Sequence, residues 1–255
     1  MRIVVAGGTG TVGRHVVAVG RGRGHDVVGI SRATGHDLAR GREGLDAALD
    51  GADAVVDVTN VVTLSTRTAV GFGTRVTRRL LAAEDRAGVG HHVVLSVVGI
   101  DGIDTGYYAG KLAQERMVAT AGVPWTIQRA AQLHELAEQA LGFARLGPVS
   151  VVPRMLSRPV AARTVAERLV DHVEAGPAGR AVDLVGPREE VVAELARRLL
   201  RARGSRRRVV EVTLPGAYGR GLASGALRGE EGAAVVGPDF ASWLAGVGGE
   251  EAHGH

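Results

Sequence analysis

Residues 2–13, with the sequence RIVVAGGTGTVG, are the most informative stretch of this 255-residue chain. The apolar run is typical of a strand buried on both faces, and a helical stretch follows the glycines. Gly7 would allow a tight turn, Gly10 would let the backbone approach a phosphate, and Gly13 would let the helix pack close to the strand. N–H groups at the start of this helix favour an anion. The stretch therefore predicts a loop that holds the pyrophosphate of a dinucleotide.

The end of the second predicted strand, residues 26–30, indicates which dinucleotide is bound. NAD-selective folds of this kind place an acidic residue there, about 20 positions after the glycines, where it binds the ribose 2′-hydroxyl. This chain has Ser31 and Arg32 instead. A guanidinium pairs with a phosphate through two charge-assisted hydrogen bonds, so these residues favour NADP(H) over NAD(H). Asp37 would reverse the preference if it, rather than Arg32, faced the ribose.

The composition limits the classes of protein to be considered. The chain has no cysteine, which excludes disulfides, thiolate chemistry and cysteine-ligated metals. No apolar run approaches the ~18 residues of a membrane-spanning helix, and the first strand begins too early to leave room for a signal peptide. We therefore expect a cytoplasmic protein without membrane association. The net charge is only +4, arginine dominates the cations, and Lys111 is the only lysine.

Three features that suggest other classes of function or site are weak. His134-Glu135 resembles the start of a zinc-binding helix, but the second histidine is absent, so we expect no metal site. Residues 201–208 form the densest basic run, but no aromatic residue lies among the arginines to stack on bases. We expect a solvated helix end and loop there, and no binding of nucleic acid. His91 and His92 precede a strand and are expected to be exposed.

Strand and helix signals alternate along most of the chain, which predicts an α/β fold with a doubly wound parallel sheet of the Rossmann type. The predicted strands are residues 2–6, 26–30, 53–58, 92–96, 125–129, 149–152, 181–185 and 209–213. The predicted helices are residues 11–23, 41–50, 66–88, 107–121, 132–145, 162–175 and 187–203. We expect residues 1–255 to form a single domain with a small C-terminal substrate-side lobe, mainly from residues 132–160 and 186–247. We expect a mobile loop at 216–237 and a frayed tail at 248–255.

Three residues in the middle of the chain predict acid–base chemistry beside the cofactor. Ser96 ends a buried strand, and Tyr107 and Lys111 lie four residues apart on one face of a predicted helix. A phenol has a pKa near 10 and is a poor acid at neutral pH, but a neighbouring ammonium lowers that pKa. Lys111 can also hold the nicotinamide ribose, and Ser96 can orient a substrate carbonyl. Together they could protonate an oxygen while a hydride reaches the carbon.

The order of these motifs resembles that of the short-chain dehydrogenases/reductases, in particular their extended and atypical NAD(P)H-binding, NmrA-like subgroup. The resemblance is carried by the glycine loop, Ser31-Arg32, residues 56–60, Ser96, the Tyr107–Lys111 helix and residues 126–132. It covers nearly the whole chain, and its specific motifs are the glycine loop and the Tyr/Lys pair. It implies a Rossmann domain with a smaller C-terminal lobe and an NADP(H)-linked activity.

The resemblance also implies roles for individual residues. The pyrophosphate would face Gly7, Thr9, Gly10, Thr11 and Val12, and Gly13 would complete the loop. Ser31 and Arg32 would bind the 2′-phosphate. The strand that passes beneath the cofactor would end in Asp57, Val58, Thr59 and Asn60, of which Thr59 or Asn60 would reach the nicotinamide side. Ser96, Tyr107 and Lys111 would be the catalytic triad.

Three further residues are expected in the wall of the substrate pocket. Tyr108 competes with Tyr107 for the role of the phenol, but its spacing of three residues to Lys111 matches the pattern less well. Gln132 and His134 belong to a segment that follows a predicted strand and should line the pocket. His134 is otherwise an ordinary, partly buried histidine.

We therefore expect an NADP(H)-dependent oxidoreductase that transfers a hydride to or from a small to medium organic carbonyl or alcohol. Many atypical members of the resembled group lack the tyrosine, so its presence here favours active chemistry. Two alternatives stay open: a redox-sensing regulator that binds NADP without turning it over, and an epimerase or dehydratase that borrows a hydride and returns it. The sequence decides neither the substrate nor the choice between a monomer and a homodimer.

Overall fold

The structure is a computed structural model that describes residues 1–41 and 43–252. The chain divides into two compact units. The first unit comprises Met1–Val97, Asp104–Arg129 and Val165–Val182, and the second comprises Val98–Ile103, Ala130–Thr164 and Asp183–His255. Within the described part of the chain, no helix has both the length and the apolar character needed to cross a membrane.

The first unit is built on a parallel sheet with the strand order β2-β1-β3-β4-β5. Its strands are β1 (Arg2–Ala6), β2 (Asp26–Ile30), β3 (Ala54–Asp57), β4 (His91–Val97) and β5 (Trp125–Ala130), and the short β9 (Gly179–Arg180) pairs with β5. Every residue of β3 is buried, as expected for a strand covered on both faces. The first five strands predicted from the sequence are therefore confirmed, each within one residue at its ends.

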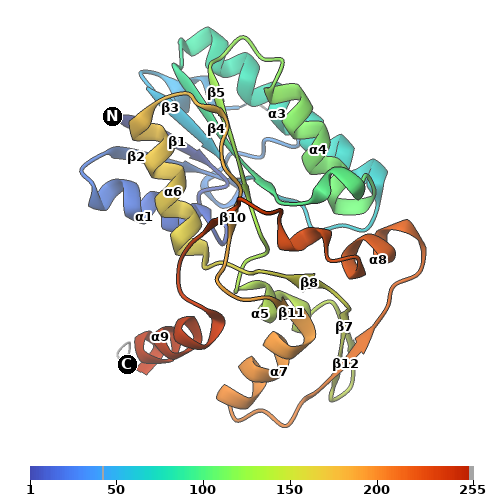
Figure 1. Ribbon diagram of the computed structural model, residues 1–255. Coiled ribbons are helices and arrows are strands. Elements are labelled where there is room, and N and C mark those ends of the chain that lie inside the picture. Colours follow the sequence, from blue (N-terminus) through green and yellow to red (C-terminus); the bar gives the residue numbers. More distant parts are fainter. Residues whose placement is uncertain (42, 253–255) are drawn as a thin grey trace. The chain divides into compact units, whose positions relative to one another are not determined.

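Helices cover both faces of this sheet. They are α1 (Gly13–Gly22), α2 (Leu45–Leu49), α3 (Thr66–Ala87), α4 (Gly106–Val118) and α6 (Ala162–Ala175), with a short 3-10 helix, η1 (Arg32–Thr34). Figure 1 shows α1 and α6 on one face and α3 and α4 on the other. This arrangement is a doubly wound α/β fold of the Rossmann type, and it confirms the predicted fold class.

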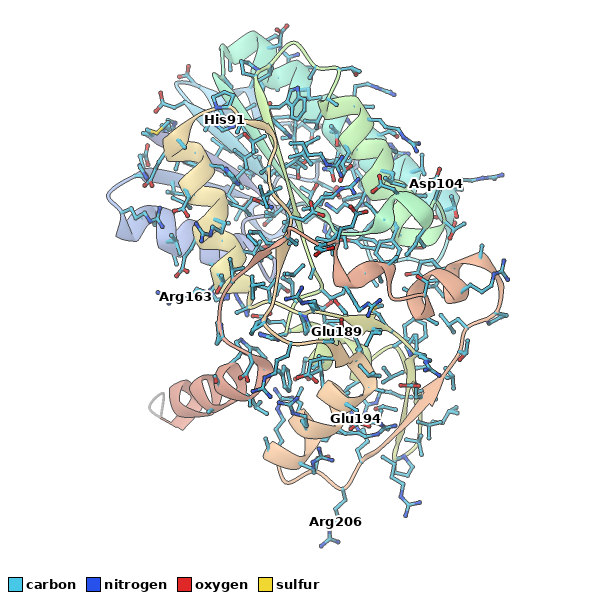
Figure 2. The ribbon with its side chains drawn as sticks, in the orientation of Figure 1. His91, Asp104, Arg163, Glu189, Glu194 and Arg206 are labelled. Atoms are coloured by element: carbon cyan, nitrogen blue, oxygen red, sulfur yellow. The ribbon has the colours of Figure 1, made fainter. Side chains whose placement is uncertain are left out.

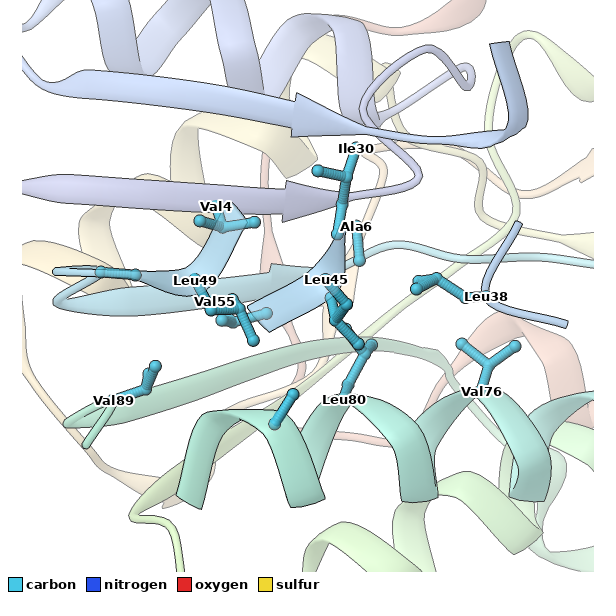
Figure 3. Packing of buried hydrophobic residues seen from close by; sticks show 12 residues of the cluster. Val4, Ala6, Ile30, Leu38, Leu45, Leu49, Val55, Val76, Leu80 and Val89 are labelled. Atoms are coloured by element: carbon cyan, nitrogen blue, oxygen red, sulfur yellow. The ribbon is translucent and has the colours of Figure 1, made fainter. Parts of the chain in front are cut away.

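Aliphatic side chains hold α2 and α3 against the sheet (Figure 3). The cluster is lined by Val4, Ile30 and Val55 from the strands, Leu45 and Leu49 from α2, and Val76 and Leu80 from α3. Each of these side chains is at most 1% exposed. Burial of one such side chain contributes about 1.5–3 kcal/mol, so a core with few aromatic residues can still be stable.

The strand order determines where this sheet can bind a ligand. Chain order reverses between β1 and β3, because β2 lies on one side of β1 and β3 and β4 lie on the other. In open parallel sheets, ligands bind outside the carboxyl ends of the strands at such a reversal. The residues that follow β1 and β3 there are the glycine loop and Val58 to Asn60.

The second unit contains short strands and helices. A three-stranded sheet has the order β12-β7-β6, from β12 (Arg208–Val212), β7 (Val149–Pro153) and β6 (Ala144–Leu146). Two-stranded pairings join β8 (Leu156–Ser157) to β11 (Glu190–Val191) and β10 (Leu184–Val185) to β13 (Ala234–Val235). The helices are α5 (Leu136–Leu141), α7 (Val192–Ala202), α8 (Gly216–Ala223) and α9 (Phe240–Ala252), with 3-10 helices η2 (Ile100–Gly102) and η3 (Ala226–Arg228).

The core of the second unit lies between α5, α7 and β7. Its buried side chains include Ala140, Val152, Leu195, Leu199 and Phe240. The apolar residues of α7 recur at helical spacing, so one face of this helix is buried while its arginines stay on the other.

The C-terminal part of the chain is more regular than the sequence predicts. The loop predicted over 216–237 is wrong for 216–223, 226–228 and 234–235, which form α8, η3 and β13. In α8, Leu222 is buried and Gly219 approaches the backbone of Leu214. The predicted helix 187–203 begins later, since the segment first forms β11. The predicted strand at 181–185 is reduced to β10, and the helices predicted at 41–50 and 132–145 are shorter. Of the tail predicted to be frayed, 248–252 belong to α9, and 253–255 lie outside the described residues.

The basic run at 201–208 begins at the end of α7 and continues as a loop into β12. Arg206 is exposed and extends away from the rest of the chain (Figure 2). Arg203 pairs with Glu138 of α5. The predicted solvated helix end and loop is therefore confirmed.

The prediction that His91 and His92 are exposed is wrong. Both histidines belong to β4, which lies between β3 and β5 in the sheet. The residues are 4% and 0% exposed, and Figure 2 labels His91 at this strand. His91 Nε2 lies 2.8 Å from Thr126 Oγ1, and His92 Nδ1 lies 2.9 Å from both carboxylate oxygens of Glu84. These partners make burial of both rings possible.

The two histidines respond to burial in opposite ways. Burial, together with the neighbouring His92 and His172, lowers the pKa of His91 to about 4. Burial also works against a charge on His92, but the Glu84 carboxylate outweighs it and raises the pKa of His92. Adjacent residues of one strand therefore contribute opposite pH dependences to stability.

We predict that His91→Gln flattens the loss of stability on acidification. The unfolded histidine binds a proton near pH 6.5, whereas the folded His91 does so only near pH 4. Its contribution is therefore complete above pH ~6.5 and is lost as the pH falls towards ~4, with a slope of up to about 1.4 kcal/mol per pH unit. Urea denaturation at several pH values in this window measures the slope.

The same titration of His92→Gln supplies the control. His92 has a raised pKa, so its contribution is present at low pH and is lost as the pH rises through the folded value. Below pH ~6.5 both the folded and the unfolded His92 are protonated, so its removal should leave the slope between pH ~4 and ~6.5 unchanged and should abolish a loss of stability only above pH ~6.5. An unchanged slope between pH ~4 and ~6.5 in His91→Gln, or a flattened slope there in His92→Gln, would contradict this assignment.

Candidate functional site

The glycine loop turns sharply between β1 and α1. Gly7 has φ of +85°, a conformation that side chains other than glycine rarely adopt. Its N–H and that of Gly8 donate to the Ile30 carbonyl at 2.9 and 3.2 Å, which ties the loop to the end of β2. A Cβ on Gly7 would lie 3.0 Å from the Val58 carbonyl oxygen, so the loop also touches the chain that leaves β3.

The start of α1 approaches the same loop without room for a side chain. A Cβ on Gly13 would lie 2.1 Å from the Gly7 carbonyl oxygen, far inside van der Waals contact. Between these glycines, Thr9 and Gly10 are exposed, Thr11 is half-buried and Val12 is buried. The loop is therefore a backbone cradle, open to solvent at its middle, at the start of a helix. Such a cradle fits a pyrophosphate.

The residues after β2 lie at the same edge of the sheet. Arg32 is exposed, and its guanidinium makes no hydrogen bond or ion pair within residues 1–41 and 43–252. The Ser31 hydroxyl is buried without a hydrogen-bond partner in the same part of the chain. Asp37 is committed elsewhere: it accepts from the Ala39 N–H at 3.1 Å and lies 3.7 Å from Arg40. An available cation and hydroxyl, rather than a carboxylate, thus follow β2.

Asp57 ends β3 as a fully buried carboxylate. Its Oδ1 accepts from the Thr59 N–H at 2.8 Å and from the Thr59 hydroxyl at 2.6 Å. Its Oδ2 accepts from Gln114 Nε2 at 2.7 Å. Asp57 therefore shapes the turn that presents Thr59 and Asn60, and it does not face solvent.

Lys111 is 7% exposed and reaches into the sheet from α4. Its ammonium donates to the Leu95 carbonyl at 2.9 Å, to Gln114 Oε1 at 3.0 Å and to the Thr59 carbonyl at 3.3 Å. Burial lowers the pKa of Lys111, and the charges of Asp57 and Glu115 oppose that effect. All three N–H donors have acceptors, so a contact with a ribose would require one of them to be exchanged.

Tyr107 and Lys111 line one pocket with Thr59, Asn60 and Gln114. The pocket has a volume of about 20 Å³, room for about one water molecule. Tyr107 is half-buried, and its ring packs edge-on against that of Tyr108 at 5.1 Å between centroids. Tyr108 itself is 2% exposed and does not line this pocket.

Ser96 lies in β4, one residue after the carbonyl that accepts from Lys111. It is 2% exposed, and its hydroxyl has no hydrogen-bond partner within residues 1–41 and 43–252. A buried hydroxyl without a partner costs about 1–3 kcal/mol, which favours a role in binding a ligand atom. Ser96 is not among the residues that line the Tyr107 pocket.

Glycines also position the helix that carries Tyr107 and Lys111. A Cβ on Gly110 would lie 2.7 Å from the Ala69 carbonyl oxygen of α3, and one on Gly73 would lie 2.8 Å from the Gly110 carbonyl oxygen. The backbones of α3 and α4 therefore meet directly beside Lys111. This contact leaves α4 little freedom to slide along α3.

Two of the residues predicted for the substrate pocket belong to the second unit. His134 is 1% exposed, its Nε2 lies 3.0 Å from the Pro238 carbonyl oxygen, and its ring packs against Phe240 and Trp243. Gln132 is half-buried, and its carbonyl accepts from the Val160 N–H. In the second unit taken by itself, His134 thus anchors the start of α9. The role of both residues in a pocket stays a prediction.

Two buried partners of this site were not predicted. Gln114 bridges Asp57 and Lys111, and Glu115 forms a two-pronged ion pair with Arg129, with both N–O distances at 2.7 Å. A signal existed only for Glu115, since it lies four residues after Lys111 on the same helix face and a carboxylate on a buried face needs a partner. The described residues contain no group of three or more His, Asp and Glu side chains arranged to hold a metal ion.

Comparisons with known proteins identify relatives of the fold. No family model matches the chain, and no curated protein matches it. Among solved structures it is similar to MoeE5 in complex with UDP-glucose and NAD, with 17% identity, a TM-score of 0.70, and coverage of 98% of this chain and 100% of the other. The UDP-glucose 4-epimerase of Thermus thermophilus in complex with NAD gives 17% identity, a TM-score of 0.67, and coverage of 97% and 93%.

A third similar structure is the dTDP-4-dehydrorhamnose reductase of Bacillus anthracis str. Ames in complex with NADP. It gives 12% identity, a TM-score of 0.61, and coverage of 83% of this chain and 84% of the other. At these identities the comparisons show a shared fold, and they cover nearly all of this chain in the first two cases.

We predict that Gly110→Ala lowers the free energy of unfolding by about 1–3 kcal/mol, because the new methyl group overlaps the α3 backbone. Gly71→Ala, in α3 itself, is the matched control: nothing lies within 4 Å of its Cβ position. It should stabilise by up to about 1 kcal/mol through helix propensity alone. Urea denaturation of both variants measures the difference, and equal effects would exclude a tight α3–α4 contact.

Proposed function

We propose that this chain is an NADP(H)-dependent oxidoreductase that transfers a hydride to or from an organic carbonyl or alcohol. The observation that carries the proposal is the position of two features at one edge of one sheet. The glycine loop and the pocket lined by Tyr107 and Lys111 both belong to the first unit, and the segment after β3 contacts both. We accordingly group the chain with the short-chain dehydrogenases/reductases.

The residues present fit a dinucleotide. The cradle between Gly7 and Gly13, which side chains would fill, supports binding of the pyrophosphate at the start of α1. Arg32 supports binding of a 2′-phosphate, because its charge is exposed and uncommitted within the described residues. Asp37 gives less support to NAD(H), since its carboxylate already binds its own loop. The bound nicotinamide would supply or accept the hydride.

The chain's own residues would then manage the proton. Tyr107 would donate its phenolic proton to the carbonyl oxygen as the hydride reaches the carbon, and would take it back in the reverse direction. The buried Lys111 ammonium would stabilise the phenolate that remains. The Ser96 hydroxyl, which has no hydrogen-bond partner within the described residues, would donate a hydrogen bond to the same carbonyl oxygen.

The similar structures indicate the substrates to test first. They include reductases and 4-epimerases described with dTDP- or UDP-linked sugars, and with NAD or NADP. We infer that a nucleotide-linked sugar is one suitable class of substrate for this chain. Epimerisation is the second candidate reaction, because the same tyrosine, lysine and hydride can oxidise and then reduce one carbon. It would give turnover without net consumption of cofactor.

We predict that the protein binds NADPH more tightly than NADH and that Arg32→Ala removes most of the difference. Loss of charge-assisted hydrogen bonds to a phosphate should weaken NADPH binding by about 10–100-fold and leave NADH binding nearly unchanged. Isothermal titration calorimetry measures both affinities. Arg78→Ala, which removes an exposed arginine on α3, is the matched control. Equal binding of both cofactors by the wild type would contradict the NADP(H) assignment.

We predict that Tyr107→Phe lowers kcat by about 10²–10⁴-fold while the dissociation constant of NADPH stays the same, since the phenol acts only on the substrate. Tyr108→Phe is the control, because it removes a hydroxyl from the neighbouring buried ring. The assays follow both cofactor oxidation and sugar products, so they detect a reductase and an epimerase. Cofactor binding with no turnover on any carbonyl tested would favour the regulator instead.

A further inference from the structure

Lys111 belongs to a buried network that extends beyond the tyrosine and lysine of the proposed reaction. Of the three acceptors around its ammonium, two are main-chain carbonyls, of Leu95 and Thr59. The third is the Gln114 side-chain oxygen, whose own amide nitrogen donates to Asp57. Gln114 is 3% exposed and Asp57 is 0% exposed, so bulk water has little access to these bonds.

The chemistry of the three groups fixes the direction of the bridge. An ionised Asp57 only accepts hydrogen bonds, and a charged Lys111 only donates them. Gln114 can do both, so its NH2 group must face the carboxylate and its oxygen must face the ammonium. The glutamine thus joins the two ions as a neutral side chain that donates to one and accepts from the other.

The charged groups around Lys111 determine how much this bridge stabilises its ammonium. The charged or titratable groups that face it are Asp57 from β3, Glu115 from its own helix, and Tyr107 in the shared pocket. Glu115 is committed to the ion pair with Arg129. Asp57 forms no ion pair within residues 1–41 and 43–252. The Asp57 carboxylate therefore balances the charge of the Lys111 ammonium and also acts on the buried His92.

We propose that Asp57 and Gln114 are positioning residues that hold Lys111 as a charged, oriented ammonium through the bridge Asp57–Gln114–Lys111. Their place in catalysis rests on the proposed function, whereas the bridge itself is a property of the free protein. Gln114 is the informative position, because it supplies the only side-chain acceptor of the three and can be replaced. The bridge explains why the Lys111 ammonium, which lies against the backbone of Leu95 and Thr59, can stay charged although burial disfavours its charge.

The chain offers a direct test, because Lys111 is its only lysine. Full-length protein with a lysine-free tag, labelled with 13Cε-lysine, gives one lysine signal in an NMR spectrum, and a pH titration without cofactor reads its pKa. We expect Gln114→Met, which keeps the size and removes the amide, to lower this pKa by at least about one unit, a tenfold change in the proton affinity. Asp57→Asn keeps the shape, removes the charge, and should lower it as well.

Two controls make the result specific. Asp85→Asn removes an exposed carboxylate on α3 and should leave the Lys111 signal unchanged. The double variant Asp57→Asn/Gln114→Met should show less than the sum of the two shifts, because both changes break one bridge. Thermal unfolding checks that each variant is folded. An unshifted pKa in a folded Gln114→Met, or fully additive shifts in the double variant, would overturn the proposal.

The same signal separates this inference from the proposed function. Addition of NADPH should change the chemical shift of the Lys111 signal in the wild type. Gln114→Met should weaken NADPH binding by at least about tenfold. If NADPH leaves the chemical shift of the wild-type Lys111 signal unchanged, that result would contradict cofactor binding near Lys111. The titration without cofactor would still decide whether the bridge exists.

Discussion

The arrangement of the first unit depends on one contact, between the start of α1 and the turn after β1. At this contact, backbone atoms occupy the space that a side chain would otherwise fill. Gly13 can lie against the Gly7 carbonyl only because Gly13 has no Cβ. The contact brings a helix start, the end of β2 and the chain after β3 to one point of the sheet. The backbone cradle of the glycine loop, the exposed Arg32 after β2 and the turn held by Asp57 lie at this edge of the sheet.

Sequence patterns predicted the first unit well and the second poorly. The strands β1, β2 and β3 are short apolar runs bounded by glycine or polar residues, so their limits can be read locally. In the second unit, α8 has the sequence GAYGRGLA, whose glycines argue against a helix, yet burial of Leu222 holds it in place. Tertiary packing determines the secondary structure of such segments, and a local sequence pattern does not reveal that packing.

The site divides in the same way. The glycine loop, Arg32, Tyr107 and Lys111 were predicted, because their types and spacings have a chemical meaning along the chain. The bridge from Asp57 to Gln114 joins residues 57 positions apart, and the exposure of His91 and His92 was misjudged. Both errors have one cause: a partner such as Glu84 or Gln114 lies on a different element, and the sequence does not reveal the pairing.

The burial of the only lysine also shapes the outer surface of the protein. Every positive side chain there, other than histidine, is an arginine, whose guanidinium keeps its charge at any pH in which the fold survives. In the folded chain, a reagent that acylates or alkylates ε-amines would find no solvent-exposed lysine side chain. Modification of Lys111 would therefore require the first unit to open. The rate of amine labelling thus reports on that opening.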